Sequence, residues 1–135
     1  MVGFNIAMAR ETEDKGLDTD TLRRGIAALL RNDNLGFYLV AEVDGQPAGQ
    51  IMVTTEWSDW RNSHFWWLQS LYVLPEHRRK GVFRSLYDYI VARAKEAGDV
   101  CGIRLYVERT NHRAKDVYVN LGMELSHYDM YEVEF

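Results

Sequence analysis

The fold is decided by the stretch Leu74-Pro75-Glu76-His77-Arg78-Arg79-Lys80-Gly81-Val82-Phe83-Arg84. It follows the apolar run Phe65–Val73 and opens Val82–Ala97, where apolar residues recur at every third or fourth position. We therefore expect a strand that leads through a basic turn into a helix. The first N–H groups of a helix have no partner within it and lie at the positive end of its dipole, so they favour an anion such as phosphate.

The charge of this turn opposes that of the whole chain. Residues 76–84 carry four Arg or Lys and one Glu, a charge of +3 in a chain of net charge −4, so the other residues sum to −7. The four basic residues are Arg78, Arg79, Lys80 and Arg84. Cations at a helix start oppose the helix dipole, so a phosphate site explains them better than a solvated charge cluster does. Gly81 leaves the turn open to close approach by a ligand.

Length and composition narrow the classes of protein. The chain has 135 residues, of which 47% are hydrophobic and 27% are charged, as in a single soluble domain. No apolar run approaches the ~20 residues of a membrane span, and no signal peptide is visible. Cys101 is the single cysteine, which fits a reducing cytoplasm. The net negative charge argues against a nucleic-acid partner, and the four His and one Cys lack metal-ligand spacing.

In the first half of the chain, the sequence pattern predicts a helix followed by three strands. Residues 2–14 fit both a strand and one face of a helix. A capped helix is expected over Asp18–Leu30. The strands are expected over Phe37–Val43, Ala48–Thr55 and Phe65–Val73. The turn Asp44-Gly45-Gln46-Pro47 joins the first two strands, and a polar and aromatic connector, Glu56–His64, joins the last two.

The second half predicts two more helix–strand units. The helix Val82–Ala97 has the strongest periodicity of the chain and stops at Gly98, and a buried strand is expected over Gly102–Val107. A short helix then starts at Thr110-Asn111, and Met123–Phe135 alternates like a strand. An antiparallel meander that feeds a β-α-β crossover gives an α/β (mixed α+β) fold, with a mostly antiparallel sheet and helices on both faces.

This order of elements, with the basic turn between the third strand and the long helix, resembles the GNAT acetyltransferase superfamily over most of the chain. The family pattern Arg/Gln-x-x-Gly-x-Gly/Ala reads here Arg78-Arg79-Lys80-Gly81-Val82-Phe83. A second family pattern, Asn-x-x-Ala-x-x-x-Tyr-x-x-x-Gly-Phe, reads Asn111-x-x-Ala114-x-x-x-Tyr118-x-x-x-Gly122-Met123. Each is weak alone, but both in this order and on these elements are specific. The resemblance implies one GNAT domain over residues 1–135.

The resemblance implies acetyl-CoA as co-substrate and a primary amine of a small molecule or protein as acceptor. The CoA phosphates would lie on the turn, and the pantetheine arm along the strand before it. The implied cofactor-binding residues are Leu71, Tyr72, Val73, Arg78, Arg79, Lys80, Gly81, Val82, Phe83, Arg84 and Asn111. Tyr118 matches the family's general acid, and a phenol suits this role because it stays protonated at neutral pH.

Three departures from the family keep an alternative open. Phe83 stands where the family has Gly or Ala, and residues 66–70 lack the carboxylate that often acts as general base. The strand that usually precedes the first helix has no clear counterpart, which would make residues 2–14 helical. A non-catalytic acyl-CoA-binding or regulatory module of the same fold is therefore the alternative to an enzyme.

The connector Glu56–His64 is the candidate acceptor site. Trp57 and Trp60 could wall a pocket in which Glu56 or Asp59 receives a cationic amine and its proton. The alternative is that these Trp side chains pack on neighbouring helices and the charges form local salt bridges. Trp66 and Trp67 fit core and sheet-face positions, or a homodimer patch.

Overall fold

The computed structural model describes the backbone of residues 1–135 and every side chain except that of Glu13. The chain divides into two compact units, Met1–Leu105 and Tyr106–Phe135. The first unit contains α1 (Val2–Glu13), α2 (Thr19–Leu30), β1 (Phe37–Val43), β2 (Gln46–Ser58), β3 (Ser63–Val73), the short 3₁₀ helix η1 (Pro75–His77), α3 (Val82–Ala97) and β4 (Val100–Arg104). The second contains α4 (His112–Asn120). Among the described residues, no helix is both long and apolar enough to cross a membrane.

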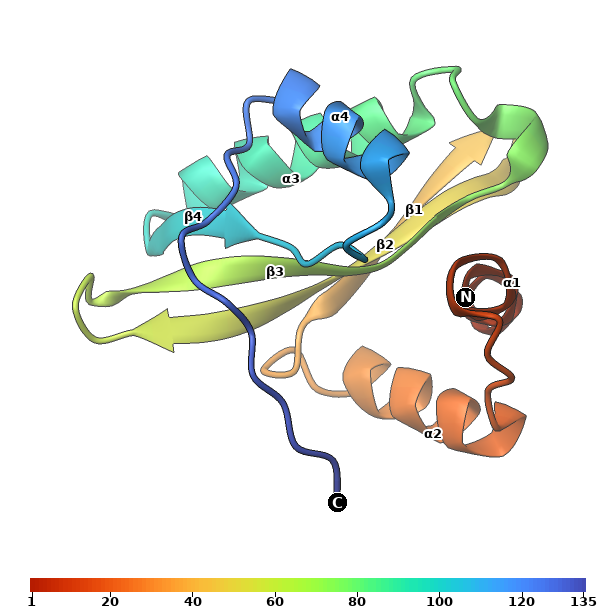
Figure 1. Cartoon of the computed structure of the whole chain (residues 1–135), viewed down its shortest axis with the longest axis horizontal. Coiled ribbons are helices and arrows are strands. Elements are labelled where there is room, and N and C mark those ends of the chain that lie inside the picture. Colours follow the sequence, from red (N-terminus) through yellow and green to blue (C-terminus); the bar gives the residue numbers. More distant parts are fainter. The chain divides into compact units, whose positions relative to one another are not determined.

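The first unit is a four-stranded sheet with helices on both faces. The strands lie in the order β1-β2-β3-β4. The β1–β2 and β2–β3 pairs are antiparallel, and β3 and β4 are parallel because α3 carries the chain across the sheet between them. Figure 1 shows α1 and α2 on one face of this sheet and α3 on the other. The predicted fold class is confirmed.

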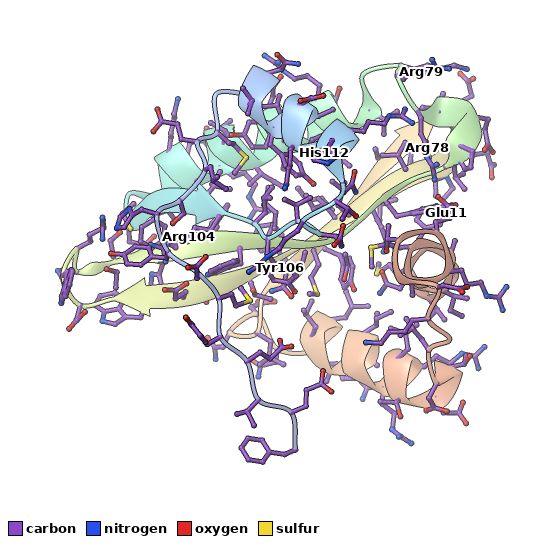
Figure 2. All side chains as sticks on the ribbon, in the orientation of Figure 1. Glu11, Arg78, Arg79, Arg104, Tyr106 and His112 are labelled. Atoms are coloured by element: carbon purple, nitrogen blue, oxygen red, sulfur yellow. The ribbon has the colours of Figure 1, made fainter. Side chains whose placement is uncertain are left out.

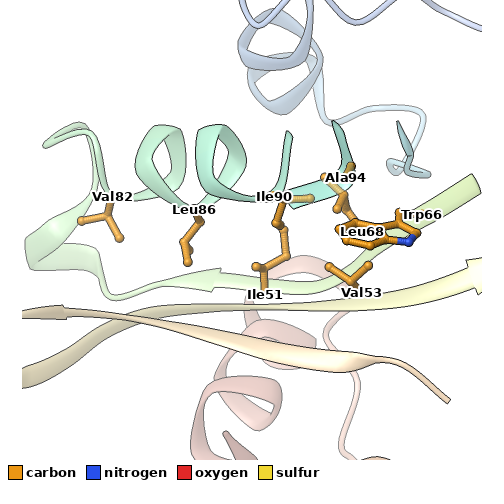
Figure 3. Packing of buried hydrophobic residues seen from close by; sticks show 8 residues of the cluster. All are labelled: Ile51, Val53, Trp66, Leu68, Val82, Leu86, Ile90 and Ala94. Atoms are coloured by element: carbon orange, nitrogen blue, oxygen red, sulfur yellow. The ribbon is translucent and has the colours of Figure 1, made fainter. Parts of the chain in front are cut away.

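The core lies between α3 and the sheet, where the apolar stripe of α3 meets apolar side chains of β2 and β3 (Figure 3). The eight buried residues of this cluster are Ile51, Val53, Trp66, Leu68, Val82, Leu86, Ile90 and Ala94. The four on α3 recur at every fourth position, which places them on one face of the helix. This packing fixes the start of α3, and therefore the turn before it, against the sheet.

The N-terminal segment, which fitted both a strand and a helix in sequence, is the helix α1. The next helix, α2, is capped as expected, because the Asp18 carboxylate accepts a hydrogen bond of 2.7 Å from the Thr21 N–H. The sheet accordingly begins with β1, and the first described strand follows two helices rather than preceding them.

The prediction that Glu56–His64 is a connector is wrong. β2 continues to Ser58 and β3 begins at Ser63, with Trp57 paired to His64, so a turn of four residues remains. Continued strand pairing supplies hydrogen-bond partners for backbone groups that a long connector would leave to water. Asn62, with a φ of 48°, allows the tight reversal.

The prediction of a strand over Met123–Phe135 is also wrong, because these residues form no regular structure. Alternating apolar side chains favour a strand only where another strand supplies hydrogen-bond partners. Within the unit 106–135, whose backbone is fully described, the regular structure is α4 alone. The strand expected over Gly102–Val107 is displaced toward the N-terminus, to Val100–Arg104.

We expect Ile90→Ala to lower the free energy of unfolding by about 2–5 kcal/mol, because Ile90 is fully buried and its truncation leaves a cavity. Urea unfolding measures the change. Tyr89→Ala is the control, since this neighbouring α3 residue is 54% exposed and should cost far less. Equal losses from both variants would contradict the position of the core.

Candidate active site

A bulge divides β3 into two halves. The register with β2 places Ser70 and Leu71 of β3 together opposite Ile51. Ser70 has a φ of 48°, a left-handed conformation that residues other than glycine seldom adopt. One extra residue changes which face the following side chains reach, as a bulge does when it redirects a strand. Residues on both sides of Ser70 can therefore contribute to the α3 core.

Beyond Trp67, before the bulge is reached, one edge of β3 loses its strand partner. β4 pairs with β3 only from His64 to Trp67. On the other side, β2 pairs with residues 68–69 and 72–73, which flank the bulge, but no described strand lies along the edge beyond Trp67. Backbone groups on such an edge can accept an extended ligand in the way that they would accept another strand. The predicted pantetheine segment, Leu71–Val73, lies on this edge.

The basic turn follows directly from this edge. Arg79 and Gly81 have φ values of 62° and 83°, and α3 begins at Val82. No described side chain caps this helix, and its first turn contains no acidic residue, so an anion meets neither a competing acceptor nor a repelling charge there. A Cβ built on Gly81 would meet no protein atom within 4 Å, which leaves open space beside the turn.

The basic side chains of the turn differ in their partners. Arg79 and Lys80 are exposed and form no ion pair with a described side chain. Arg84 donates from Nε to Asp88 Oδ2 over 3.0 Å, as an exposed pair one helical turn apart. Arg79 and Lys80 are therefore the most accessible cations for a phosphate, while Arg78 is engaged within the chain.

Arg78 and Glu11 join the turn to α1, where Figure 2 shows the two side chains directed toward each other. Arg78 Nη2 donates to Glu11 Oε2 over 2.6 Å, and Arg78 Nε donates to the Val73 carbonyl over 2.8 Å. Tyr72 donates from its hydroxyl to Glu11 Oε1 over 2.7 Å. The hydrogen bond from Tyr72, together with Arg78, holds the pKa of Glu11 below its usual value. Burial, and then the Glu11 carboxylate, raise the pKa of Tyr72.

A second tie joins α1 to the bulge. Gln50 is fully buried and donates from Nε2 to Asn5 Oδ1 over 2.7 Å and, more weakly, to the Ser70 carbonyl over 3.4 Å. Asn5 in turn donates to the Tyr38 hydroxyl over 3.2 Å. Because buried amides are costly without partners, this network fixes α1 against the strands at the bulge.

Phe83, which replaces the small residue of the family pattern, is half-buried and packs against the α3 core. Its ring centroid lies 6.2 Å from that of Tyr87 on the same helix. The side chain therefore contributes to the core, while the backbone N–H of Phe83 remains part of the first turn of α3.

Glu56 lies on β2 and is held by two partners. It accepts hydrogen bonds from Trp67 Nε1 and, over 3.0 Å, from Arg104 Nη1. The Arg104 guanidinium also lies over the ring of Phe65, 3.6 Å from its centroid. A carboxylate thus faces the central strand after all, supplied by the neighbouring strand rather than by residues 66–70.

The other predicted acceptor residues lie at or near the β2–β3 turn. Asp59 Oδ1 accepts a hydrogen bond of 2.9 Å from the Trp60 N–H. Trp60 is 86% exposed, and Trp57 is 53% exposed with its ring edge-on to His64. Glu56 and Asp59 therefore have separate sets of partners, and both Trp side chains are largely exposed.

The second unit carries the remaining predicted residues. Asn111 caps α4 by accepting a hydrogen bond of 3.1 Å from the Ala114 N–H. Tyr118 lies on α4 and is half-buried, and burial raises the pKa of its phenol. The side chain therefore stays protonated at neutral pH, as a proton donor must.

Sequence reasoning missed Glu11, Gln50 and Arg104. Glu11 shares a helical face with apolar residues of α1, which was the one available signal. Gln50 and Arg104 carry no motif: strand register brings Arg104 to Glu56, and the packing of α1 on the sheet brings Asn5 to Gln50. Among the described residues, no three His, Cys, Asp or Glu side chains gather closely enough to hold a metal ion.

Comparison with known proteins identifies the family. The model of the acetyltransferase (GNAT) family matches residues 4–123, which includes both sequence motifs and the turn described above. The chain belongs to this family. The predicted resemblance is confirmed, and a GNAT acetyltransferase requires an acceptor for the group that it transfers.

Individual relatives agree with this GNAT assignment. A protein of Archaeoglobus fulgidus described as an uncharacterized N-acetyltransferase is 33% identical over 93 residues, which cover 68% of this chain and 62% of that protein. The crystal structure of a possible acetyltransferase from Clostridium difficile 630 is similar at a TM-score of 0.92 and 46% identity, covering 99% of this chain and 88% of the other. A ribosomal-protein-alanine N-acetyltransferase from Brucella melitensis shares the fold, with a TM-score of 0.75 at 17% identity over 99% of this chain and 93% of the other.

We expect the Glu11 contacts to stabilise the fold in a pH-dependent way. Because the pKa of Glu11 is lowered in the folded state, its contribution is fully present above the ordinary value of 4.5 and is lost as the pH falls through the folded value. Thermal unfolding of the wild type and Glu11→Gln should differ most above pH 4.5, and the difference should shrink in acid. A difference that stays constant down to the lowest pH at which both proteins fold would contradict it.

Proposed function

We propose that this protein is an N-acetyltransferase that moves the acetyl group of acetyl-CoA directly to a primary amine of a small molecule or protein. The proposal rests on one observation: a free strand edge and a free helix start follow each other along the chain. The unpartnered edge of β3 leads, through the turn, to the uncapped start of α3. An extended amide chain fits the first feature and a phosphate fits the second, and CoA combines both in one molecule.

Several details support acetyl-CoA as the co-substrate. Arg79 and Lys80 are exposed beside the α3 start, and the space next to Gly81 is open. The backbone of Leu71, Tyr72 and Val73 would hold the pantetheine arm, the N–H groups of residues 79–84 would hold the phosphates, and Asn111 would contact the arm. Family membership agrees with this co-substrate. We further propose that residues 1–135 act as one such domain in the cytoplasm.

The chemistry requires two proton transfers. Acetyl-CoA supplies a thioester, and the amine nitrogen forms a bond to the acetyl carbon as the carbon–sulfur bond breaks. We assign Tyr118 as the acid that protonates the sulfur, while a carboxylate or a bound water takes a proton from the amine. Holding both substrates together can offset on the order of 7–11 kcal/mol of the barrier.

The direct test is incubation of the protein with acetyl-CoA and pools of amines, followed by mass spectrometry. We expect an acetylated amine to appear together with free CoA. The Tyr118→Phe variant keeps the aromatic ring but cannot donate a proton, so turnover should fall by roughly 10²–10⁴-fold with acetyl-CoA binding little changed. Tyr131→Phe is the control, because Tyr131 is 94% exposed in the same unit and should leave turnover unchanged. Normal turnover of Tyr118→Phe would remove the acid role.

One observation favours the alternative, a non-catalytic acyl-CoA-binding or regulatory module. Both oxygens of Glu56 already accept hydrogen bonds, one from Trp67 and one from the Arg104 guanidinium. A carboxylate held by two partners has fewer lone pairs free to accept a proton from the amine. Saturable CoA binding without acetylation of any amine in the pools would favour the module.

The acceptor residues are tested separately. Glu56 and Asp59 are the carboxylates nearest to the aromatic β2–β3 turn in sequence, and we propose that one of them receives the cationic amine. Glu56→Gln or Asp59→Asn should lower kcat/KM for the acetylated amine roughly tenfold, most strongly at low pH where the amine is protonated, without changing the affinity for CoA. Glu42→Gln, an exposed change on β1, should have no effect. If both substitutions behave like Glu42→Gln, the acceptor binds elsewhere.

A further inference from the structure

Glu11 occupies a position that the proposed chemistry does not use. It lies on α1, yet both of its carboxylate oxygens accept hydrogen bonds from the proposed CoA-binding segment, one from Tyr72 of β3 and one from Arg78 of the turn. Arg78 is 67 residues away in the sequence, so this contact closes a long loop of the chain. A carboxylate so engaged acts on the turn rather than on a substrate.

Arg78 transmits this contact to the turn. Its guanidinium is fixed on three sides, by Glu11, by the Val73 carbonyl at the end of β3 and by the ring of Tyr72, whose centroid lies 5.4 Å away. The next residue, Arg79, has a φ of 62°, which residues other than glycine seldom adopt. The surrounding structure must therefore hold this backbone, and Arg78 is the residue immediately before it.

We infer that Glu11 is a positioning residue for the cofactor: by holding Arg78, it keeps the turn in the conformation that presents its N–H groups to the CoA phosphates. This inference rests on the proposed function, because it assumes that CoA binds at the turn. It gives α1 a role in cofactor binding although α1 carries no residue of the CoA motif.

The charge of Glu11 and its contact with Arg78 should affect CoA binding in opposite directions. Glu11 is an anion in the neighbourhood of a site for a polyanion, so removing its charge should strengthen CoA binding if charge were its only effect. Removing it should weaken CoA binding if it holds the turn. The sign of the change therefore separates the two effects.

The test is calorimetric titration of the wild type, Glu11→Ala and Asp88→Ala with CoA, and with pantetheine in competition with CoA. Alanine is a good helix former, and the Glu11 and Asp88 side chains are 41% and 58% exposed, so both variants should fold. Asp88→Ala is the matched control, because Asp88 also pairs with an arginine of the turn region but is held to α3 alone. Thermal unfolding at neutral pH checks that all three proteins are folded.

We expect Glu11→Ala to weaken CoA binding about threefold to tenfold and to leave pantetheine, which lacks the nucleotide phosphates, within twofold of the wild type. Asp88→Ala should leave CoA affinity equal or slightly higher. Equal or tighter CoA binding by Glu11→Ala, or equal losses for CoA and pantetheine, would overturn the inference. Absence of CoA binding by the wild type would instead overturn the proposed function.

Discussion

In β3, the left-handed backbone at Ser70 inserts one residue opposite Ile51, and the rest of the site depends on this bulge. From His64 to Trp67, the strand is paired on both sides, with β2 and with β4. Beyond Trp67, through the bulge and up to Val73, β2 is its one described strand partner, which leaves a backbone edge for a ligand. Because the same half of the strand runs directly into the turn before α3, a strand-like site and an anion site follow each other along one segment of chain.

Contacts on both faces of the sheet hold the end of β3 and the turn before α3 in place. On the α3 face, apolar side chains such as Val82 and Leu86 pack closely and fix the helix start through burial. On the α1 face, polar ties run from Asn5 to Gln50 at the bulge and from Glu11 to Arg78 at the turn, beside apolar packing such as that of Phe4 on Tyr72. Hydrogen bonds are directional, so these ties fix orientation where apolar packing alone would allow small shifts.

Local signals in the sequence predicted the fold well and the site in part. The helix Val82–Ala97 and the strand Phe37–Val43 have their predicted bounds, since periodicity and turn residues specify both within a short window. The β2–β3 hairpin and the irregular tail were missed because they depend on whether a strand finds a partner. The turn was visible as a motif, but the partner of Arg78 was not, because a contact across 67 residues has no periodic signature. The contact between Arg104 and Glu56 was missed as well, because strand register creates it and leaves no periodic signature in the sequence.

The central claim, that the second half of β3 and the turn form one CoA site, is tested most directly by NMR titration of the ¹⁵N-labelled protein with CoA. We expect the amide shifts of Leu71–Val73 and of residues 79–84 to change together with a single saturable dissociation constant. The amide shifts of β1, on the far edge of the sheet, should stay unchanged. Shift changes that saturate elsewhere while the turn amides stay unchanged would contradict the claim.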